Sequence, residues 1–176
     1  PVIVCGNPRL KTVVAAASYE AKRFGVKSGM SLPEALALCP DARLVEGDPI
    51  RYAETSRRIF ALLSSFATTL EIFSIDEAFL DVTATADLLG GKRPLAEAIK
   101  RAVRQETGLP CSVGVAPNKM LAKIAASLVK PDGLAVLEPE AVAGFMERLP
   151  AREVPGIGPR LSALLSDWGL ETCGQI

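Results

Sequence analysis

The order of apolar segments between residues 70 and 137 constrains the fold of this chain more than any other feature. Short apolar runs that contain β-branched residues and end at turn residues favour strands, whereas apolar residues at i, i+3 and i+4 favour amphipathic helices. By these criteria the segments alternate as strand, strand, helix, strand, helix and strand: 70–75, 78–82, 94–107, 111–116, 118–130 and 134–137. This β-β-α-β-α-β order predicts an α+β fold, an incomplete ferredoxin-like domain whose first strand and helix would partly precede the chain.

The first 66 residues predict a smaller set of mixed elements. Short strands and helical turns are expected to alternate here: strands over 2–5, 12–17 and 43–45, and helical turns over 18–25 and 31–39. Ser31 is a typical N-cap residue, and Pro33 suits the first turn of the second helix, which Pro40 would end. A longer amphipathic helix is expected over 51–66.

Composition and charge set the general class of protein. The chain has 176 residues, of which 49% are hydrophobic and 23% charged, as in a folded globular protein. Its formal net charge is zero, so any nucleic-acid binding must come from local patches. No apolar run reaches the ~18 residues of a membrane span and no signal-peptide pattern is present, so we expect a cytoplasmic protein without a membrane partner. The chain begins with Pro1 rather than methionine, and we expect it to be an internal piece of a longer protein.

The absence of histidine and the spacing of the cysteines limit the possible chemistry. Without histidine, imidazole is excluded as a base or a metal ligand within this chain. The cysteines stand singly, without a CxxC pair, and are expected to be buried, reduced thiols: Cys5, Cys39, Cys111 and Cys173. Catalysis would therefore need carboxylates, lysines, hydroxyl groups or a metal.

Two adjacent carboxylates, Asp76 and Glu77, interrupt the apolar sequence FSIDEAFLD between the first two predicted strands of the ferredoxin-like domain. Burying an unpaired charge is costly, and neighbouring residues on a regular strand point to opposite faces. A tight hairpin connection would let both carboxylates reach one site. Two hard oxygen ligands beside an open face suit magnesium, which accepts one or two carboxylates together with substrate phosphates. A solvent-exposed Asp-Glu turn would show the same residues.

A first group of basic residues follows the predicted 118–130 helix. Lys119, Lys123 and Lys130 share one helix face, opposite the apolar residues. Pro131 and Gly133 place Lys130 at the helix end, where its ammonium group could meet a phosphate. A solvated helix face would give the same pattern.

A second basic group lies near the N-terminus. Lys22 and Arg23 follow Tyr19 by three and four residues. One hydroxyl and two cations within a helical turn could bind a triphosphate together. An exposed amphipathic turn would look the same.

The C-terminal sequence contains two glycine turns between short helical segments. Gly156 and Gly158 lie in PGIG, immediately before an apolar-periodic run, and Gly169 opens a second, similar turn. Glycines let backbone N–H groups at a helix start approach a phosphate oxygen. This helix-hairpin-helix pattern is typical of proteins that hold the DNA backbone without reading bases, with a plain helical turn as the alternative.

Four motifs, in this order and at these intervals, resemble the Y-family translesion DNA polymerases of the DNA polymerase IV type: SYEAKRFGVKSGM, FSIDEAFLDVT, CSVGVAPNKMLAKIAASLVKPDG and VPGIG. The resemblance covers essentially the whole chain. It implies a partial fingers domain over 1–47, a palm catalytic domain without its first strand over 48–137, and a truncated helix-hairpin-helix thumb over 138–176. The implied function is template-directed DNA synthesis past damaged bases. The implied partners are primer-template DNA, deoxynucleoside triphosphates and, through parts beyond residue 176, a sliding clamp.

The resemblance also implies roles for single residues. Asp76 and Glu77 match the palm carboxylates that hold two Mg²⁺ ions, which activate the primer 3′-hydroxyl and stabilise the leaving pyrophosphate. Other matching positions contact the triphosphate or the DNA backbone: Tyr19, Lys22 and Lys130, with Arg23 beside them, for the triphosphate, and Gly156 and Gly158 for DNA. We expect Lys119 and Lys123 to add contacts to DNA.

Three departures from the family pattern bear on activity. The first metal-binding aspartate and the aromatic residue that excludes ribonucleotides would precede Pro1, so this segment alone is not expected to polymerise DNA. Ala16 and Lys22 stand where the family usually has threonine and arginine. We expect both differences to lower the affinity for the nucleotide. Two alternatives stay open: a non-catalytic DNA-binding relative that keeps the fold, and a nucleotidyl cyclase, which would have no use for a helix-hairpin-helix segment.

Overall fold

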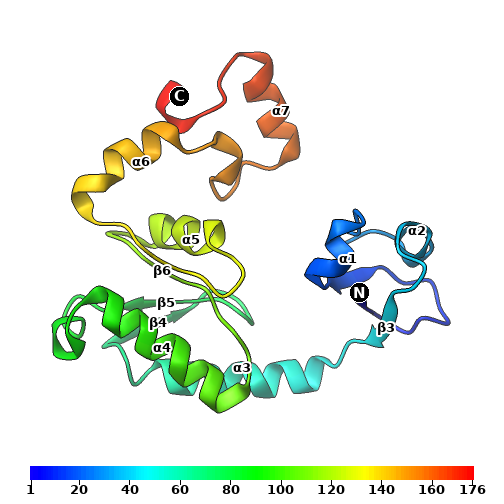
Figure 1. Cartoon of the computed structure of the whole chain (residues 1–176), viewed down its shortest axis with the longest axis horizontal. Helices are drawn as coiled ribbons and strands as arrows, with labels where there is room; N and C mark the ends of the chain where they lie inside the picture. The colour runs from blue at the N-terminus through cyan, green and yellow to red at the C-terminus, as the bar shows by residue number, and fades with distance from the viewer. The chain divides into compact units, whose positions relative to one another are not determined.

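The computed structural model describes residues 1–176, which form two units, Pro1–Ala53 and Glu54–Ile176 (Figure 1). The boundary between the units falls within helix α3 (Pro49–Leu63). Helix α3 confirms the amphipathic helix predicted over 51–66, although it begins two residues earlier and ends three residues earlier than predicted. No helix combines the length and the apolar character that crossing a membrane requires.

The first unit is a three-stranded sheet with two short helices. Its central strand β1 (Val2–Cys5) pairs antiparallel with β2 (Val14–Ala17) and parallel with β3 (Arg43–Glu46). The predicted strand over 12–17 begins only at Val14, because the ladder with β1 ends where Val14 pairs with Cys5. Before the ladder, the Thr12 carbonyl accepts a hydrogen bond from the Leu32 N–H at 3.1 Å, and the Thr12 hydroxyl accepts one from the Gly6 N–H at 2.9 Å.

The helices of the first unit begin where the sequence predicts. Ser18 caps α1 (Tyr19–Arg23), and Ser31 forms a capping box with Glu34 at the start of α2 (Leu32–Leu38). Both helices bury their small or apolar residues with the inner residues of the sheet: Ile3, Cys5, Val14, Ala21, Val26, Leu32, Ala35 and Cys39. This core holds α1 and its exposed side chains in place.

The second unit contains the predicted strand and helix order. An antiparallel pair, β4 (Thr69–Ile72) with β5 (Ala78–Asp81), is followed by α4 (Lys92–Thr107), β6 (Val113–Val115), α5 (Lys119–Leu128) and β7 (Leu134–Val136). Strands β6 and β7 pair in parallel, as a crossover through α5 requires. The two strand pairs form separate two-stranded sheets, so the ferredoxin-like sheet is present as two halves.

Helix α5 lies close against β6, and Gly114 makes this approach possible. A Cβ atom at Gly114 would lie 2.2 Å from the Ala122 carbonyl oxygen and 2.5 Å from the Ala126 nitrogen. The helix buries Leu121, Ile124 and Ala125, as predicted, and turns its lysines away from this core. Helix α4 also contacts β6 and β7. It contributes the most buried residues to the hydrophobic core of the second unit, among them Leu95, Ile99 and Val103.

Helix α5 ends at Leu128, two residues before Lys130, so the prediction that all three lysines share one helix face is wrong. A residue that precedes proline is disfavoured in helical conformation, and Lys130 precedes Pro131. Lys119 and Lys123 remain on the helix, while Lys130 belongs to the loop that leads to β7.

The C-terminal part of the second unit consists of short helices, coloured orange to red in Figure 1. Helix α6 (Val142–Arg148) is followed by a 3₁₀ turn, the glycine-rich loop, helix α7 (Pro159–Asp167) and a final 3₁₀ turn: η3 (Ala151–Glu153) and η4 (Cys173–Gln175). Backbone hydrogen bonds tie the end to the beginning of this segment, with the Cys173 N–H donating to the Leu149 carbonyl at 2.8 Å. All four cysteines are free thiols, of which Cys5 and Cys39 are buried.

Candidate active site

Asp76 and Glu77 lie in the loop that connects β4 to β5, as predicted. The loop is longer than a tight turn, because β4 ends at Ile72 and the N–H groups of Phe73 and Ser74 both donate to the Glu77 carbonyl oxygen, at 3.0 and 3.1 Å. These hydrogen bonds close a five-residue connection over 73–77. The acidic pair is therefore outside the regular strand ladder.

The two carboxylates are stabilised in different ways. Asp76 is exposed, and its Oδ1 accepts a hydrogen bond of 2.7 Å from the Ser74 hydroxyl. Glu77 is half-buried, and its Oε2 lies 2.5 Å from the Lys123 ammonium group on α5. Neither carboxylate is thus an unpaired buried charge. The desolvation cost that the apolar sequence around them suggests is therefore avoided.

Ser56 anchors the acidic loop to helix α3. Its hydroxyl donates to the Ile75 carbonyl oxygen at 2.6 Å, and Ser56 is the one buried polar or charged residue of the chain. The sequence reasoning missed this residue. A signal existed, because Ser56 falls on the apolar face of α3, four residues after Tyr52 and three before Ile59.

The lysines of α5 have acidic partners on the β4–β5 hairpin. Lys119 lies 2.9 Å from a carboxylate oxygen of Glu71, a residue that the sequence reasoning also missed. Lys119 and Lys123 lie over the rings of Phe79 and Phe73, at 5.9 and 4.8 Å from the ring centroids. The predicted basic stripe is therefore a row of ion pairs and cation–π contacts between α5 and the hairpin.

Lys130 differs from the two helical lysines. It is exposed, and its side chain makes no hydrogen bond or ion pair within the chain. An unpaired ammonium group on an ordered loop can bind an anion without first losing an internal partner.

Tyr19, Lys22 and Arg23 are all exposed residues of α1 in the first unit. The Lys22 ammonium group lies 5.0 Å from the centroid of the Tyr19 ring, so hydroxyl and cation lie on the same side of this short helix. Ala16 lies on β2 and pairs with Val4, where it offers no hydroxyl group. The predicted triphosphate-binding residues are thus exposed on α1.

The glycine-rich loop leads into α7. Gly156 has φ +100°, and Gly158 is the N-cap residue of the helix. A hollow of about 540 Å³ adjoins this helix start, and its lining combines backbone, hydroxyl and charged groups: Arg152, Glu153, Gly158, Ser162, Ser166 and Glu171. Two of these groups are carboxylates, so phosphate binding at this loop would depend on the backbone N–H groups and Arg152.

The donor set fits magnesium only as part of a larger site. No cluster of three or more histidine, cysteine, aspartate or glutamate side chains is present that could hold a metal by itself. Asp76 keeps one carboxylate oxygen without a hydrogen-bond donor, and Glu77 lies next to it in the same loop. Magnesium commonly binds one or two carboxylates and completes its coordination with water and phosphate oxygens. The acidic loop fits that kind of partial ligand set.

Comparisons with known proteins agree on one family. The model of the impB/mucB/samB family matches residues 1–127. The whole chain is 48% identical to a DNA polymerase IV from Methanoculleus marisnigri and 42% identical to one from Ralstonia nicotianae, and covers 49% of each. The chain thus spans about half the length of the curated relatives it matches.

Solved structures show the same relationship in three dimensions. The crystal structure of DinB from Sulfolobus solfataricus is 38% identical and aligns with 98% of this chain and 51% of its own, with a TM-score of 0.91. The insertion ternary complex of Dbh DNA polymerase is 39% identical and aligns with 97% of this chain and 51% of its own, with a TM-score of 0.88. The mixed helix and sheet fold is therefore that of Y-family polymerase structures. The chain belongs to the impB/mucB/samB family, the Y-family DNA polymerases that its sequence motifs resemble.

Proposed function

We propose that this chain supplies the catalytic carboxylates of a DNA polymerase that copies past damaged template bases. The observation that carries the proposal is the β4–β5 loop. It presents Asp76 and Glu77 next to each other, in a chain that is 42 to 48% identical over its whole length to proteins named DNA polymerase IV. The proposed substrates are primer-template DNA and deoxynucleoside triphosphates.

Asp76 and Glu77 are the residues that would hold magnesium, two ions by the family resemblance. When bound, magnesium supplies Lewis-acid stabilisation of the charges that develop during nucleotidyl transfer. The chain's own contribution is positional: Ser74 orients Asp76 and Ser56 ties the loop to α3. Lys123 pairs with Glu77 and would give up this partner when magnesium binds.

One exposed hydroxyl group and three exposed cations are proposed to bind the triphosphate of the incoming nucleotide. These groups belong to Tyr19, Lys22, Arg23 and Lys130. Lys119, Lys123, Gly156 and Gly158 would face the DNA backbone. Contact with a sliding clamp would involve parts of the protein other than these residues.

A bypass assay with the complete encoded protein tests this function. The assay compares primer extension opposite an undamaged base and opposite an abasic site or bulky adduct, in magnesium and all four deoxynucleotides. We expect extension on both templates, with a smaller loss at the lesion than a replicative polymerase shows. Extension that stops completely at every lesion would contradict the translesion part of the proposal.

A non-catalytic DNA-binding relative is the second candidate. Two observations favour it: Ala16 provides no hydroxyl group, and Lys22 replaces the bidentate guanidinium fork with a single ammonium group. Such a protein would extend neither template in this assay, although a gel-shift measurement would show that it binds primer-template DNA.

A further inference from the structure

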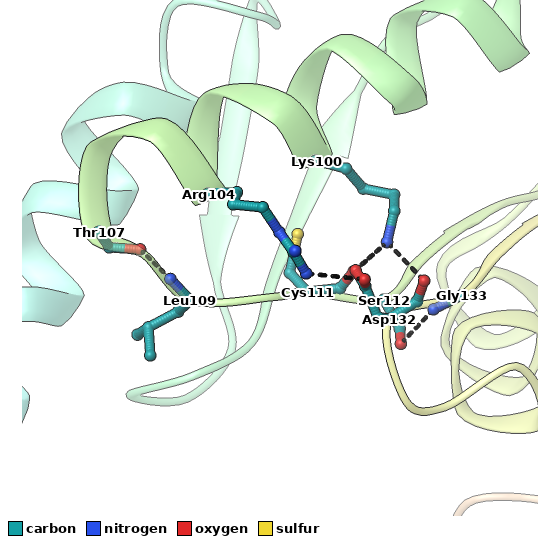
Figure 2. Close-up of polar contacts among 8 residues, drawn as sticks. All are labelled: Lys100, Arg104, Thr107, Leu109, Cys111, Ser112, Asp132 and Gly133. Atoms are coloured by element: carbon teal, nitrogen blue, oxygen red, sulfur yellow. Dashed lines mark hydrogen bonds and ion pairs between the residues drawn. The ribbon is translucent and has the colours of Figure 1, made fainter.

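Lys130 lies in the loop between α5 and β7. Figure 2 shows that α4, through Lys100 and Arg104, contacts Asp132 of this loop. The ammonium group of Lys100 donates hydrogen bonds to the Asp132 carbonyl oxygen at 2.8 Å and to Asp132 Oδ1 at 2.6 Å. A guanidinium N–H of Arg104, one turn further along α4, donates to Asp132 Oδ2 at 2.8 Å. Both carboxylate oxygens of Asp132 are therefore used by α4.

Lys100 is enclosed by protein groups. Its third hydrogen bond, of 2.6 Å, goes to the Cys111 carbonyl oxygen at the approach to β6, and its side chain is only 19% exposed. An ammonium group has three donors, and all three are occupied here. Lys100 has no donor left for a ligand, so its contacts serve the loop.

The loop itself follows an unusual backbone path. Asp132 has φ +51°, the left-handed region that costs free energy for a residue other than glycine. The next residue, Gly133, approaches the preceding helix end so closely that a Cβ atom would lie 1.9 Å from the Val129 carbonyl oxygen. Its N–H donates to the Ser112 hydroxyl at 3.1 Å. Contacts from α4 and from Ser112, the residue before β6, thus hold the loop in a conformation that it would not favour alone.

The pKa of Asp132 also reflects its contacts with α4. The hydrogen bond from Lys100 is the largest cause that lowers the pKa of Asp132, and the charges of Lys100 and Arg104 add to it. Asp132 is therefore ionised and paired at neutral pH, two residues after the unpaired Lys130.

We infer that Lys100 and Arg104 are positioning residues, which fix the ammonium group of Lys130 for phosphate binding through their contacts with Asp132. This inference rests on the proposed function, because it takes the nucleotide triphosphate as the anion that Lys130 meets. Lysine is a point charge on a flexible stem, so its binding strength depends on where the backbone places the stem. Loosening the loop should weaken nucleotide binding and leave the acidic loop unchanged.

Steady-state kinetics of the complete protein test the inference. Lys100→Met removes all three hydrogen bonds, and we expect it to raise the KM for deoxynucleotide by about tenfold, with kcat changed less than about twofold. Lys130→Ala should raise KM at least as much, and the double variant Lys100→Met/Lys130→Ala should be no worse than Lys130→Ala alone. Additive losses would overturn the inference, as would a fall in kcat with KM unchanged.

Two further variants separate positioning from general destabilisation. Arg104→Lys keeps a donor for Asp132 and should stay within about threefold of the parent KM, whereas Arg104→Met should not. Arg58→Met is the matched control, because it breaks an ion pair of 2.7 Å with Glu106 in the last turn of α4, a contact that does not involve Asp132. It should leave the KM for nucleotide unchanged. A KM increase in Arg58→Met equal to that in Lys100→Met would overturn the inference.

Binding and hydrogen exchange of the same complete proteins distinguish this inference from the proposed function. Lys100→Met should weaken equilibrium binding of a magnesium–deoxynucleotide and speed amide exchange over 129–133. If the parent extends no primer but both changes occur, the proposed function fails and the positioning role stands. If neither binding nor exchange changes, the positioning role fails, whatever the parent's activity.

Discussion

The ammonium group of Lys123 on α5 lies 2.5 Å from Glu77 Oε2 in the β4–β5 loop. Both side chains are mostly covered, at 25% and 34% exposed, so the pair is only partly screened by water. Lys123 therefore occupies a position from which it competes with a metal ion for Glu77.

Removing this competitor should strengthen metal binding. We predict that Lys123→Met in the complete protein lowers the magnesium concentration for half-maximal primer extension about fivefold, the equivalent of an ion pair of ~1 kcal/mol. A magnesium titration at saturating nucleotide measures this. Lys119→Met is the control, because its partner Glu71 lies outside the acidic loop. A higher magnesium requirement in Lys123→Met would show that Lys123 supports the metal site instead.

The Ser56 hydroxyl should matter more for catalysis than for folding. Ser56→Ala removes the hydrogen bond to the Ile75 carbonyl, and we expect a loss of about 1 kcal/mol in the free energy of unfolding. Because the acidic loop is then free to move, kcat should fall while the KM for nucleotide stays the same. Ser64→Ala removes a local hydrogen bond at the exposed end of α3 and should change neither constant. An unchanged kcat in Ser56→Ala would contradict the anchoring role.

Gly114 should be intolerant of any side chain. Gly114→Ala would place a Cβ atom against the backbone of α5, and we predict a loss of at least about 2 kcal/mol in the free energy of unfolding. Denaturant unfolding checks this. Gly144→Ala in α6 is the matched control, because the nearest atom lies 3.7 Å away in the flexible Arg148 side chain, so alanine should be neutral or stabilising there. Equal stability of the two variants would show that α5 does not depend on this close approach.

The Asp132 contacts should make stability depend on acid. The folded protein lowers the pKa of Asp132 below its ordinary value of 3.8, mainly through the Lys100 hydrogen bond. Such a group stabilises the fold above its unfolded pKa and loses that contribution as the pH falls through the lower folded pKa. We therefore expect Asp132→Asn to be less stable than the parent at neutral pH. The difference should shrink as the pH falls below about 4. Unfolding measured over this range would contradict the account if the difference grew in acid.

Much of the local structure was predictable from the sequence. The β-β-α-β-α-β order, the capped starts of α2 and α5 and the place of Asp76 and Glu77 between two strands follow from short-range signals. Periodicity, capping residues and turn residues act within a few positions, so they are visible in the chain itself.

The contacts that complete the site were not predictable in this way. Lys123 meets Glu77 across 46 positions, and Lys100 meets Asp132 across 32. Such pairs depend on how α4 and α5 pack against their strands, and no local pattern encodes that packing. The end of α5 was missed for a simpler reason, because helical periodicity continues to Lys130 while the backbone restriction before Pro131 ends the helix earlier.

Magnesium-dependent single-nucleotide primer extension by the complete protein and its Asp76→Ala variant tests the central claim most directly. Glu54→Gln, which alters an exposed carboxylate on α3, is the control. We predict that Asp76→Ala binds primer-template DNA nearly as tightly as the parent but incorporates nucleotide at least about a thousandfold more slowly, while Glu54→Gln behaves like the parent. Extension by Asp76→Ala at the parent's rate would contradict the assignment of the acidic loop as the catalytic metal site.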